Sequence, residues 1–210
     1  MSFAPAAAPK ASPKSSAYAL YSAREPLKGD GSEDAPKGVE YSLVHRTIFV
    51  YGELMAEEVV DALLGLGSGT ARSGLRTSKP AIVYGYGRFC MRDSPAPGAL
   101  AAGDRVRIDG HLLERLQPSE LNMIDSFMDR HMERVVVTVQ TEDGFGGKRE
   151  METLMYTMPT SHADKVDTSR PWDYAEFRAQ SMKAYIEEVV KPHRKRAEEQ
   201  AMLPASAAPA

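Results

Sequence analysis

The sequence predicts an α+β domain built on a curved or barrel-like β-sheet with a few helices. Short runs of β-branched and aromatic residues recur along the middle of the chain, and segments with helical spacing of apolar residues lie between and after them. The two kinds of segment do not alternate as regular β-α-β units, which favours a mixed sheet over a doubly wound one. The 210 residues are enough for one full hydrophobic core and for tails beside it.

Residues 46–64 (RTIFVYGELMAEEVVDALL) are expected to organise this domain. Residues 48–51 form a β-branched and aromatic run, Gly52 interrupts it, and apolar residues follow at helical spacing. This pattern predicts a strand, a tight turn and a helix. Such a turn directs backbone N–H groups and the positive end of a helix outward, so we expect it to hold an anion.

The middle of the chain predicts two further strands and a short helix. Residues 65–81 combine Gly and Ser with Lys and Arg, which indicates an exposed loop, and residues 93–104 are rich in Pro, Gly and Ala, which indicates irregular structure. Residues 82–91 (IVYGYGRFCM) and 106–116 predict strands. A helix is expected over 118–127, where apolar residues recur on one face.

The last elements are a hairpin and a helix. Residues 135–139 (VVVTV) predict a buried strand, 142–148 a turn, and 151–158 the partner strand of the hairpin. From 172 to 203 the spacing of apolar residues is helical, and Pro192 is expected to end or kink the helix.

These elements divide the chain into four parts. They are an Ala/Pro/Ser-rich tail over 1–43, a domain over 44–160, a C-terminal helical extension over 161–203, and a short tail over 204–210. Tails of this composition seldom fold alone, so we expect protein partners in a larger assembly to engage them. We expect a cytoplasmic or cytoskeletal location, with a mitochondrial one as the alternative, because the first residues are poor in acidic side chains.

Composition excludes several classes of function. The net charge is -3, with no basic concentration that would indicate nucleic acid or a membrane surface, and no apolar run reaches the roughly 18 residues needed to span a bilayer. The single cysteine, Cys90, forms no disulfide framework, which fits a reducing, intracellular compartment. We expect no metal, because the five histidines lack the spacing of metal ligands. They are His45, His111, His131, His162 and His193.

Three motifs in fixed order resemble the γ-glutamylcyclotransferase-like family, in particular its plant avirulence-induced branch. They are VYGEL (50–54), GYGRFCMRDSPAPGAL (85–100) and LNMIDSFMDRHMERVVVTV (121–139), and the likeness covers about 46–192. The resemblance implies that fold, and a reaction in which a γ-glutamyl amine attacks its own γ-carbonyl to form 5-oxoproline. The family uses one glutamate to move the protons, with no metal or organic cofactor.

The resemblance also assigns a binding site, in which several family residues are replaced. The threonine of the family's Y-G-T-L turn is Glu53 here, the tyrosine of its Tyr-Pro loop is Ala96, the catalytic glutamate is Met128, and a later tyrosine is Met132. The substrate-binding positions carried over from the family are Tyr51, Gly52, Glu53, Leu54, Arg88, Met128 and Met132.

No catalytic residue of the family is therefore intact, and two functions stay open. A thioether carries no titratable proton, so Met128 cannot replace a general acid or base. The first hypothesis is a catalytically degenerate binding or structural subunit, which could still take a small γ-glutamyl ligand. The second is an enzyme of the same class that uses Glu53 as a displaced base, unless Glu53 is only an exposed residue at the start of a helix. Asp125 is expected to be structural, and Asp129 to point away from the cleft.

Overall fold

The computed structural model describes residues 46–65, 77–128, 132–143 and 146–202. The expected tails over 1–43 and 204–210 and most of the expected loop over 65–81 lie outside these residues, as does Asp129. All described elements belong to one compact unit, and no helix among them is long and apolar enough to cross a membrane.

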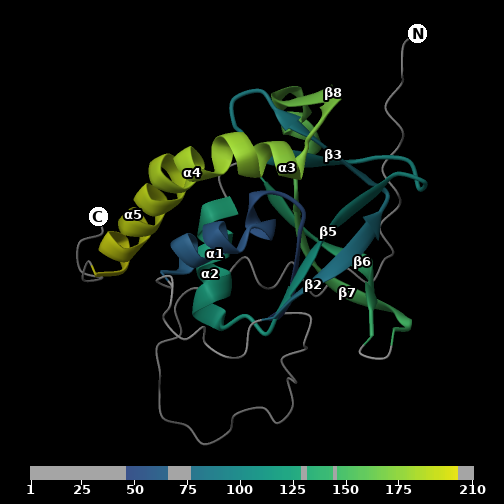
Figure 1. Cartoon of the computed structure of the whole chain (residues 1–210), viewed down its shortest axis with the longest axis horizontal. Helices are drawn as coiled ribbons and strands as arrows, with labels where there is room; N and C mark the ends of the chain where they lie inside the picture. The colour runs from purple at the N-terminus through teal and green to yellow at the C-terminus, as the bar shows by residue number, and fades with distance from the viewer. Residues whose placement is uncertain (1–45, 66–76, 129–131, 144–145, 203–210) are drawn as a thin grey trace, which may run out of the picture. The chain divides into compact units, whose positions relative to one another are not determined.

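A closed barrel of five strands forms the centre of this unit (Figure 1). Its strands are β1 (Ile48–Val50), β5 (Arg107–Glu114), β2 (Thr77–Tyr84), β6 (Glu133–Glu142) and β7 (Lys148–Thr157), in that spatial order. Strand β1 closes the barrel, since it pairs antiparallel with β5 and parallel with β7. The predicted α+β class with a barrel-like sheet is confirmed.

Apolar side chains fill the barrel. Phe49 on β1 pairs with Leu112 on β5 and with Met155 on β7, and all three are almost fully buried. Gly110 lies where β5 passes close to β1, because a Cβ atom there would be 2.4 Å from the Val50 carbonyl oxygen. The close approach of the two backbones therefore requires glycine at this position. The predicted hairpin is also confirmed, with β6 and β7 paired from Glu133 opposite Thr157 to Glu142 opposite Lys148.

A second sheet of three strands lies beside the barrel, and it corrects two expectations. Its order is β4 (Pro97–Ala101), β3 (Tyr86–Met91) and β8 (Val166–Pro171). The single strand expected over 82–91 is two strands, which separate at Gly85, where φ is 83°. The segment expected to be irregular contains β4. The small side chains of β4 give no β-strand pattern in the sequence, but they allow close packing, and Ala99 is fully buried.

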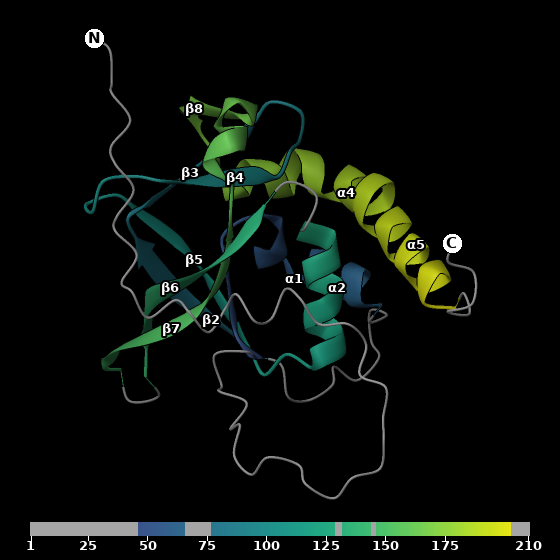
Figure 2. The same cartoon turned by 180° about the vertical axis from the view of Figure 1, so that it is seen from behind.

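The helices α1 (Glu57–Leu64) and α2 (Pro118–Met128) lie beside the barrel, as Figure 2 shows from behind. The turn after β1 leads first into a short 3₁₀ turn, η3 (Glu53–Met55), so the expected helix begins only at Glu57. Helix α1 ends at Gly65, whose φ of 77° gives a left-handed cap.

The segment expected to be a helical extension is only partly helical. It starts with the 3₁₀ turn η4 (Thr160–Lys165) and with β8, which pairs with β3. A long helix follows, in which α3 (Tyr174–Glu176), α4 (Met182–Tyr185) and α5 (Lys191–Met202) are joined by the π turns η5 (Phe177–Ser181) and η6 (Ile186–Val190).

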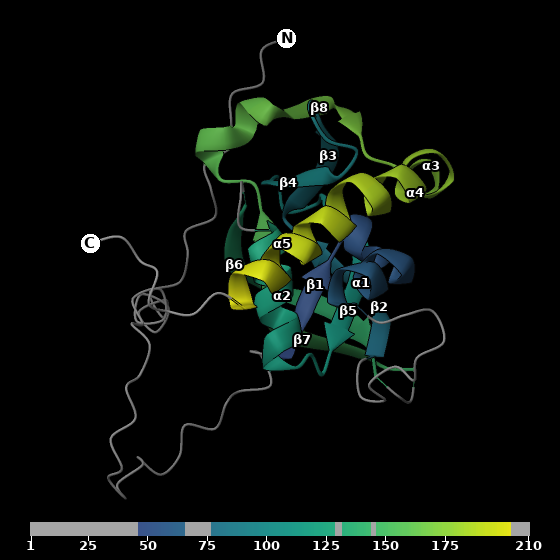
Figure 3. The same cartoon turned by 90° about the vertical axis from the view of Figure 1, so that its left-hand side faces the viewer.

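This helix does not end at Pro192. Its hydrogen bonds widen just before the proline, in η6, where the Lys191 N–H donates to the Ile186 carbonyl. The helix then continues as α5, which runs across α1 and α2 in Figure 3. Phe177, Tyr185 and Val190 belong to the same buried apolar cluster as α1 and α2, so the helix is part of the domain core.

Candidate functional site

The turn between β1 and α1 forms the centre of the candidate site. The Gly52 carbonyl accepts a hydrogen bond from Met55 N–H at 3.0 Å, and the Glu53 carbonyl accepts one from Ala56 N–H at 3.0 Å. Pro97, at the start of β4, packs on Gly52 so closely that a Cβ atom there would lie 2.6 Å from the proline Cγ. The turn is therefore held between the barrel and the second sheet.

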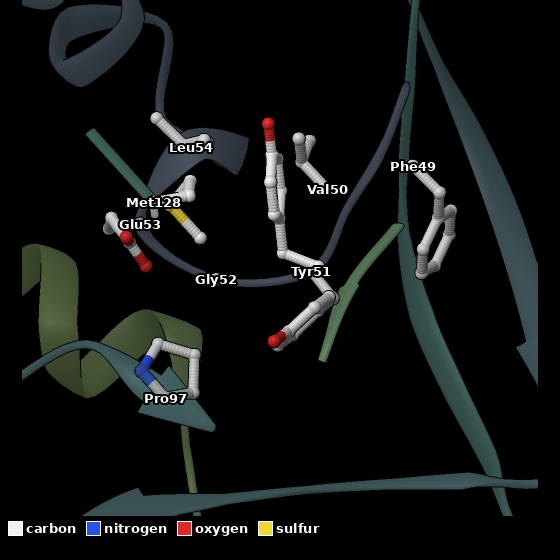
Figure 4. Close-up of a pocket in the computed structure, with 9 residues that line it drawn as sticks. Phe49, Val50, Tyr51, Gly52, Glu53, Leu54, Pro97 and Met128 are labelled. Carbon is white, nitrogen blue, oxygen red and sulfur yellow. The ribbon is translucent and has the colours of Figure 1, made fainter. Parts of the chain in front are cut away.

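A small pocket lies at this turn (Figure 4). It is lined by Phe49, Val50, Tyr51, Gly52, Glu53, Leu54, Pro97, Met128 and Tyr156. Of these residues only Met128 is partly exposed, so the pocket reaches the surface beside it. Its free volume is about 10 Å³, which is room for about one water molecule.

The structure brings the positions assigned from the sequence together. Tyr51, Gly52, Glu53, Leu54 and Met128 line the pocket directly. Met132 does not line the pocket but contacts Tyr51, whose hydroxyl donates to the Met132 sulfur at 4.0 Å.

Arg88, the remaining assigned residue, supports the turn and does not line the pocket. Its guanidinium donates to the Tyr51 carbonyl at 2.7 Å and to the Asp109 carbonyl at 3.3 Å, and it lies 5.1 Å from the centre of the Trp172 ring. These contacts connect the turn, the barrel and the start of the C-terminal helix. Arg88 thus holds the turn in place by hydrogen bonds to backbone carbonyls.

Glu53 is the main surprise of the site. Its interpretation as an exposed helix-start residue is wrong, because it is only 4% exposed. The Tyr185 hydroxyl, from α4, lies 3.5 Å from Glu53 Oε1, and the residue's own backbone N–H also bonds to the carboxylate. No basic side chain among the described residues bonds to it. Burial raises the pKa of Glu53 from its ordinary 4.5 to about 7.

The expected anion site is changed by this carboxylate. The turn leads into a 3₁₀ turn of three residues, and the N–H of Glu53 is already engaged by its own side chain. An added anion would meet a second negative charge whenever Glu53 is ionised. The turn is formed as predicted, but above about pH 7 it carries a buried negative charge of its own.

Asp125 connects α2 to the barrel. Its carboxylate accepts from Arg134 on β6 at 2.8 Å and from the hydroxyl of Tyr156 on β7. These contacts agree with the expectation that Asp125 is structural. Ala96 is buried in the core cluster, and its N–H donates to the Ser94 hydroxyl at 3.1 Å.

Sequence reasoning missed two tyrosines of the site. Tyr156 lies in the run 151–158, which indicated only a strand, and Tyr185 lies in the apolar stripe of the C-terminal helix. A hydroxyl on an otherwise apolar face was the available signal, because a buried tyrosine needs a hydrogen-bond partner. Among the described residues no group of His, Cys, Asp and Glu could hold a metal ion.

Comparison with known proteins identifies the family. The model of the family "Gamma-glutamyl cyclotransferase, AIG2-like" matches residues 48–175, and the chain therefore belongs to this family. The chain is 28% identical to AIG2-like protein D of Arabidopsis thaliana over 140 residues, which is 67% of this chain and 84% of the relative. The resemblance drawn from the three motifs is confirmed.

Solved structures are more distant in sequence. A solution structure of an Arabidopsis thaliana protein is 21% identical, covers 76% of this chain and 94% of its own, and superposes with a TM-score of 0.47. A structure titled "Gamma-glutamyl cyclotransferase" is 14% identical, covers 79% of this chain and 92% of its own, and superposes with a TM-score of 0.43.

Proposed function

We propose that this chain is a γ-glutamylcyclotransferase-like protein that has lost the cyclotransfer reaction and serves as a binding or structural subunit of a larger assembly. The observation that carries the proposal is Met128, at the mouth of the pocket, in the position where the family motif has its catalytic glutamate. Protein partners, engaged through the N- and C-terminal tails, are part of the proposal.

The chemistry of the reaction supports this function. Ring closure to 5-oxoproline needs a group that takes a proton from the attacking amine and gives one to the leaving nitrogen. The thioether of Met128 can do neither, and losing such a group costs roughly 10²- to 10⁴-fold in rate.

The size of the pocket supports it as well. A site for a small organic substrate commonly has a volume of roughly 300–1,000 Å³. The space at this turn is about 10 Å³, and buried side chains line all of it except at Met128. A γ-glutamyl group would have to displace Glu53, Met128 or Tyr156 to enter.

A direct assay tests the proposal. Purified full-length chain is incubated with γ-glutamyl amino acids and γ-glutamyl amines, and release of 5-oxoproline is measured beside an active family member. We expect release at the rate of the buffer blank. Release that rises in proportion to the amount of this chain would overturn the proposal.

One observation favours a second function, an active enzyme of the same class. Glu53 is buried at the pocket with a pKa near 7, which is the range suited to a general acid or base at neutral pH. If Glu53 acts as a displaced base, Glu53→Gln must abolish a measurable activity while the fold is kept. Absence of any activity in the wild-type chain would rule this function out.

A further inference from the structure

We infer that a groove on the outer face of the barrel binds a neutral carbohydrate about the size of a disaccharide. This groove is separate from the pocket at the Glu53 turn, so the inference goes beyond the proposed function and does not depend on whether the chain forms 5-oxoproline. It rests on the size of the groove, on the balance of charge along its rim and on an exposed tyrosine ring in its floor.

The groove forms because β6 leaves β2 early. Strand β2 pairs with β5 over Thr77–Tyr84, but it pairs with β6 only over 81–83. Strands β6 and β7 stay paired as far as Glu142 opposite Lys148, and the end of their hairpin projects from the barrel (Figure 1). Strands β2 and β5 line one side of the groove and the hairpin end lines the other. Its free volume is about 590 Å³, within the roughly 300–1,000 Å³ of small-molecule sites.

The floor of the groove is apolar and includes one exposed aromatic ring. Ala81 and Val83 of β2 point into the barrel and are buried, so their neighbours Ile82 and Tyr84 face outward. Ile82 is half-buried, whereas Tyr84 is 44% exposed. The C–H faces of a sugar ring are apolar and pack on the face of an aromatic ring. Tyr84 therefore offers a packing surface for one sugar unit.

The rim of the groove carries polar groups of both signs. The basic side chains are Lys79, Arg107 and Lys148, and the acidic ones are Asp109, Glu142 and Asp143. With Glu114, which pairs with Lys79 at 2.8 Å, three basic groups stand against four acidic ones. Neither sign dominates, so the groove has no strong field for a charged ligand. Carboxylates accept hydrogen bonds, and ammonium and guanidinium groups donate them, which suits a sugar because each of its hydroxyls does both.

Several of these groups are available to a ligand. The Tyr84 hydroxyl, the Glu142 carboxylate and the Lys148 ammonium group make no hydrogen bond or ion pair with another described residue. Arg107 and Asp109 lie 3.6 Å apart, and both side chains are more than half exposed. Such an exposed pair contributes little to stability, so its groups can turn toward the hydroxyls of a ligand at small cost.

A strand of a partner protein is a poorer occupant of the same groove. Among the described residues, 77–80 of β2 pair only with β5, so another strand could add on their other side. Pro80 has no N–H, however, and its carbonyl already accepts from the Thr141 hydroxyl at 2.9 Å. A proline at a strand edge opposes the addition of a further strand. Side chains, and not the β2 backbone, are therefore expected to recognise the ligand.

The test follows the binding of sugars to the full-length chain by amide chemical shifts. The neutral panel is cellobiose, maltose, xylobiose and diacetylchitobiose. The charged controls are cellobiuronic acid, which carries a carboxylate, and deacetylated chitobiose, which carries ammonium groups. We expect at least one neutral sugar to shift amides of β2, β5 and β6 and to bind at least about fivefold more tightly than either charged control. Binding by no neutral sugar, shifts confined to other elements, or preference for a charged sugar would overturn the inference.

Variants locate the site. Tyr84→Ala removes the aromatic packing surface and should weaken binding by about tenfold, whereas Tyr84→Phe keeps the ring and should bind within about threefold of the wild type. The control Val136→Ala truncates a similarly exposed side chain on β6 outside the groove, and it should leave binding unchanged. Amide spectra without sugar check that each variant is folded. Unchanged binding in Tyr84→Ala, or an equal loss in Val136→Ala, would contradict the inference.

A final arm tests the alternative occupant. Random peptides displayed on phage are selected on the wild-type chain and counter-selected on Tyr84→Ala. We expect no peptide whose binding depends on Tyr84. Recovery of such peptides by a chain that binds none of the neutral sugars would overturn the inference and assign the groove to a segment of a partner protein.

Discussion

The Tyr185 hydroxyl lies 3.5 Å from Glu53 Oε1 and thereby joins the C-terminal helix to the turn after β1, across 132 residues of sequence. Tyr185 also packs edge-on against Phe177 and Phe127, whose ring centres lie 5.7 and 6.4 Å away. The helix therefore covers the side of the turn on which Glu53 is buried. The charged residue Glu53 is buried because the C-terminal helix, distant in sequence, packs over it.

Glu53→Gln should stabilise the protein at and above neutral pH. The folded-state pKa of Glu53 is about 7 against 4.5 in the unfolded chain, so the folded state binds the proton more tightly. The stability of the wild type should fall as pH rises from about 4.5 to 7, by an amount on the order of 3 kcal/mol. Glutamine is neutral throughout and lacks this loss. Urea denaturation of both proteins between pH 4.5 and 8 measures it.

The matched control is Glu58→Gln. Glu58 is about half exposed and pairs with Arg178 at the surface, so its replacement should change stability by no more than about 1 kcal/mol, with no comparable pH dependence. Parallel stability curves for wild type and Glu53→Gln would show that Glu53 is not buried as an acid with a raised pKa.

Gly52→Ala should destabilise the turn. The new Cβ would lie 2.6 and 2.8 Å from two ring carbons of Pro97, and a proline ring has little freedom to move. We expect a loss of about 1–3 kcal/mol in the free energy of unfolding. Pro97→Ala in the same chain should recover part of this loss, as a double-mutant cycle would reveal. Gly103→Ala has open space around it and serves as the neutral control.

The sequence was sufficient for the parts of the fold that depend on local pattern. The run before Gly52 and the valines of 135–139 are strands because β-branched side chains alternate between two faces there. Strand β4 was missed because Ala99 and its small neighbours carry no such pattern. The break between β2 and β3 was missed because it depends on the positive φ of Gly85, and a glycine in a sequence does not reveal its backbone angle. Residues 97–101 form a strand because they pair with β3, which is a tertiary effect.

For the site too, the sequence indicated the local backbone but not the long-range packing around it. Family motifs predicted that Tyr51, Glu53 and Met128 share one site, and in the structure all three line the same pocket, with Met128 reaching it from the end of α2. The burial of Glu53 could not be read from its neighbours in sequence, because Tyr185 and Pro97 come from the distant C-terminal helix and second sheet. Long-range packing therefore determined the electrostatics of the pocket, while local pattern determined its backbone.

Phe177→Ala should show that the C-terminal helix is part of the core. Phe177 is 3% exposed and packs against Trp172 and Tyr185. Removing the ring should cost about 3–5 kcal/mol in the free energy of unfolding. Val189→Ala, on the exposed side of the same helix, should cost no more than about 0.5 kcal/mol. Similar small losses in both variants would indicate a helix that detaches from the domain.

Asp125→Asn and Tyr156→Phe should be strongly non-additive. Asp125 accepts hydrogen bonds from Arg134 and Tyr156 together, so either change breaks the same network between α2, β6 and β7. Each single change should cost about 1–3 kcal/mol, and the double change clearly less than their sum. Additive losses in urea denaturation would mean that the two side chains act independently.

Met128→Glu should not create a cyclotransferase. The new carboxylate would line the same pocket as Glu53, and two like charges in a space of about 10 Å³ raise each other's pKa and reduce stability. The walls have also changed, with Met132 in place of a tyrosine and Glu53 in place of a threonine. We expect 5-oxoproline release to stay at the blank and the free energy of unfolding to fall by about 1–3 kcal/mol at pH 8. In Met128→Gln, which adds similar bulk without the charge, the free energy of unfolding should fall by less. Robust activity in Met128→Glu would instead show that a single residue separates this chain from a working enzyme.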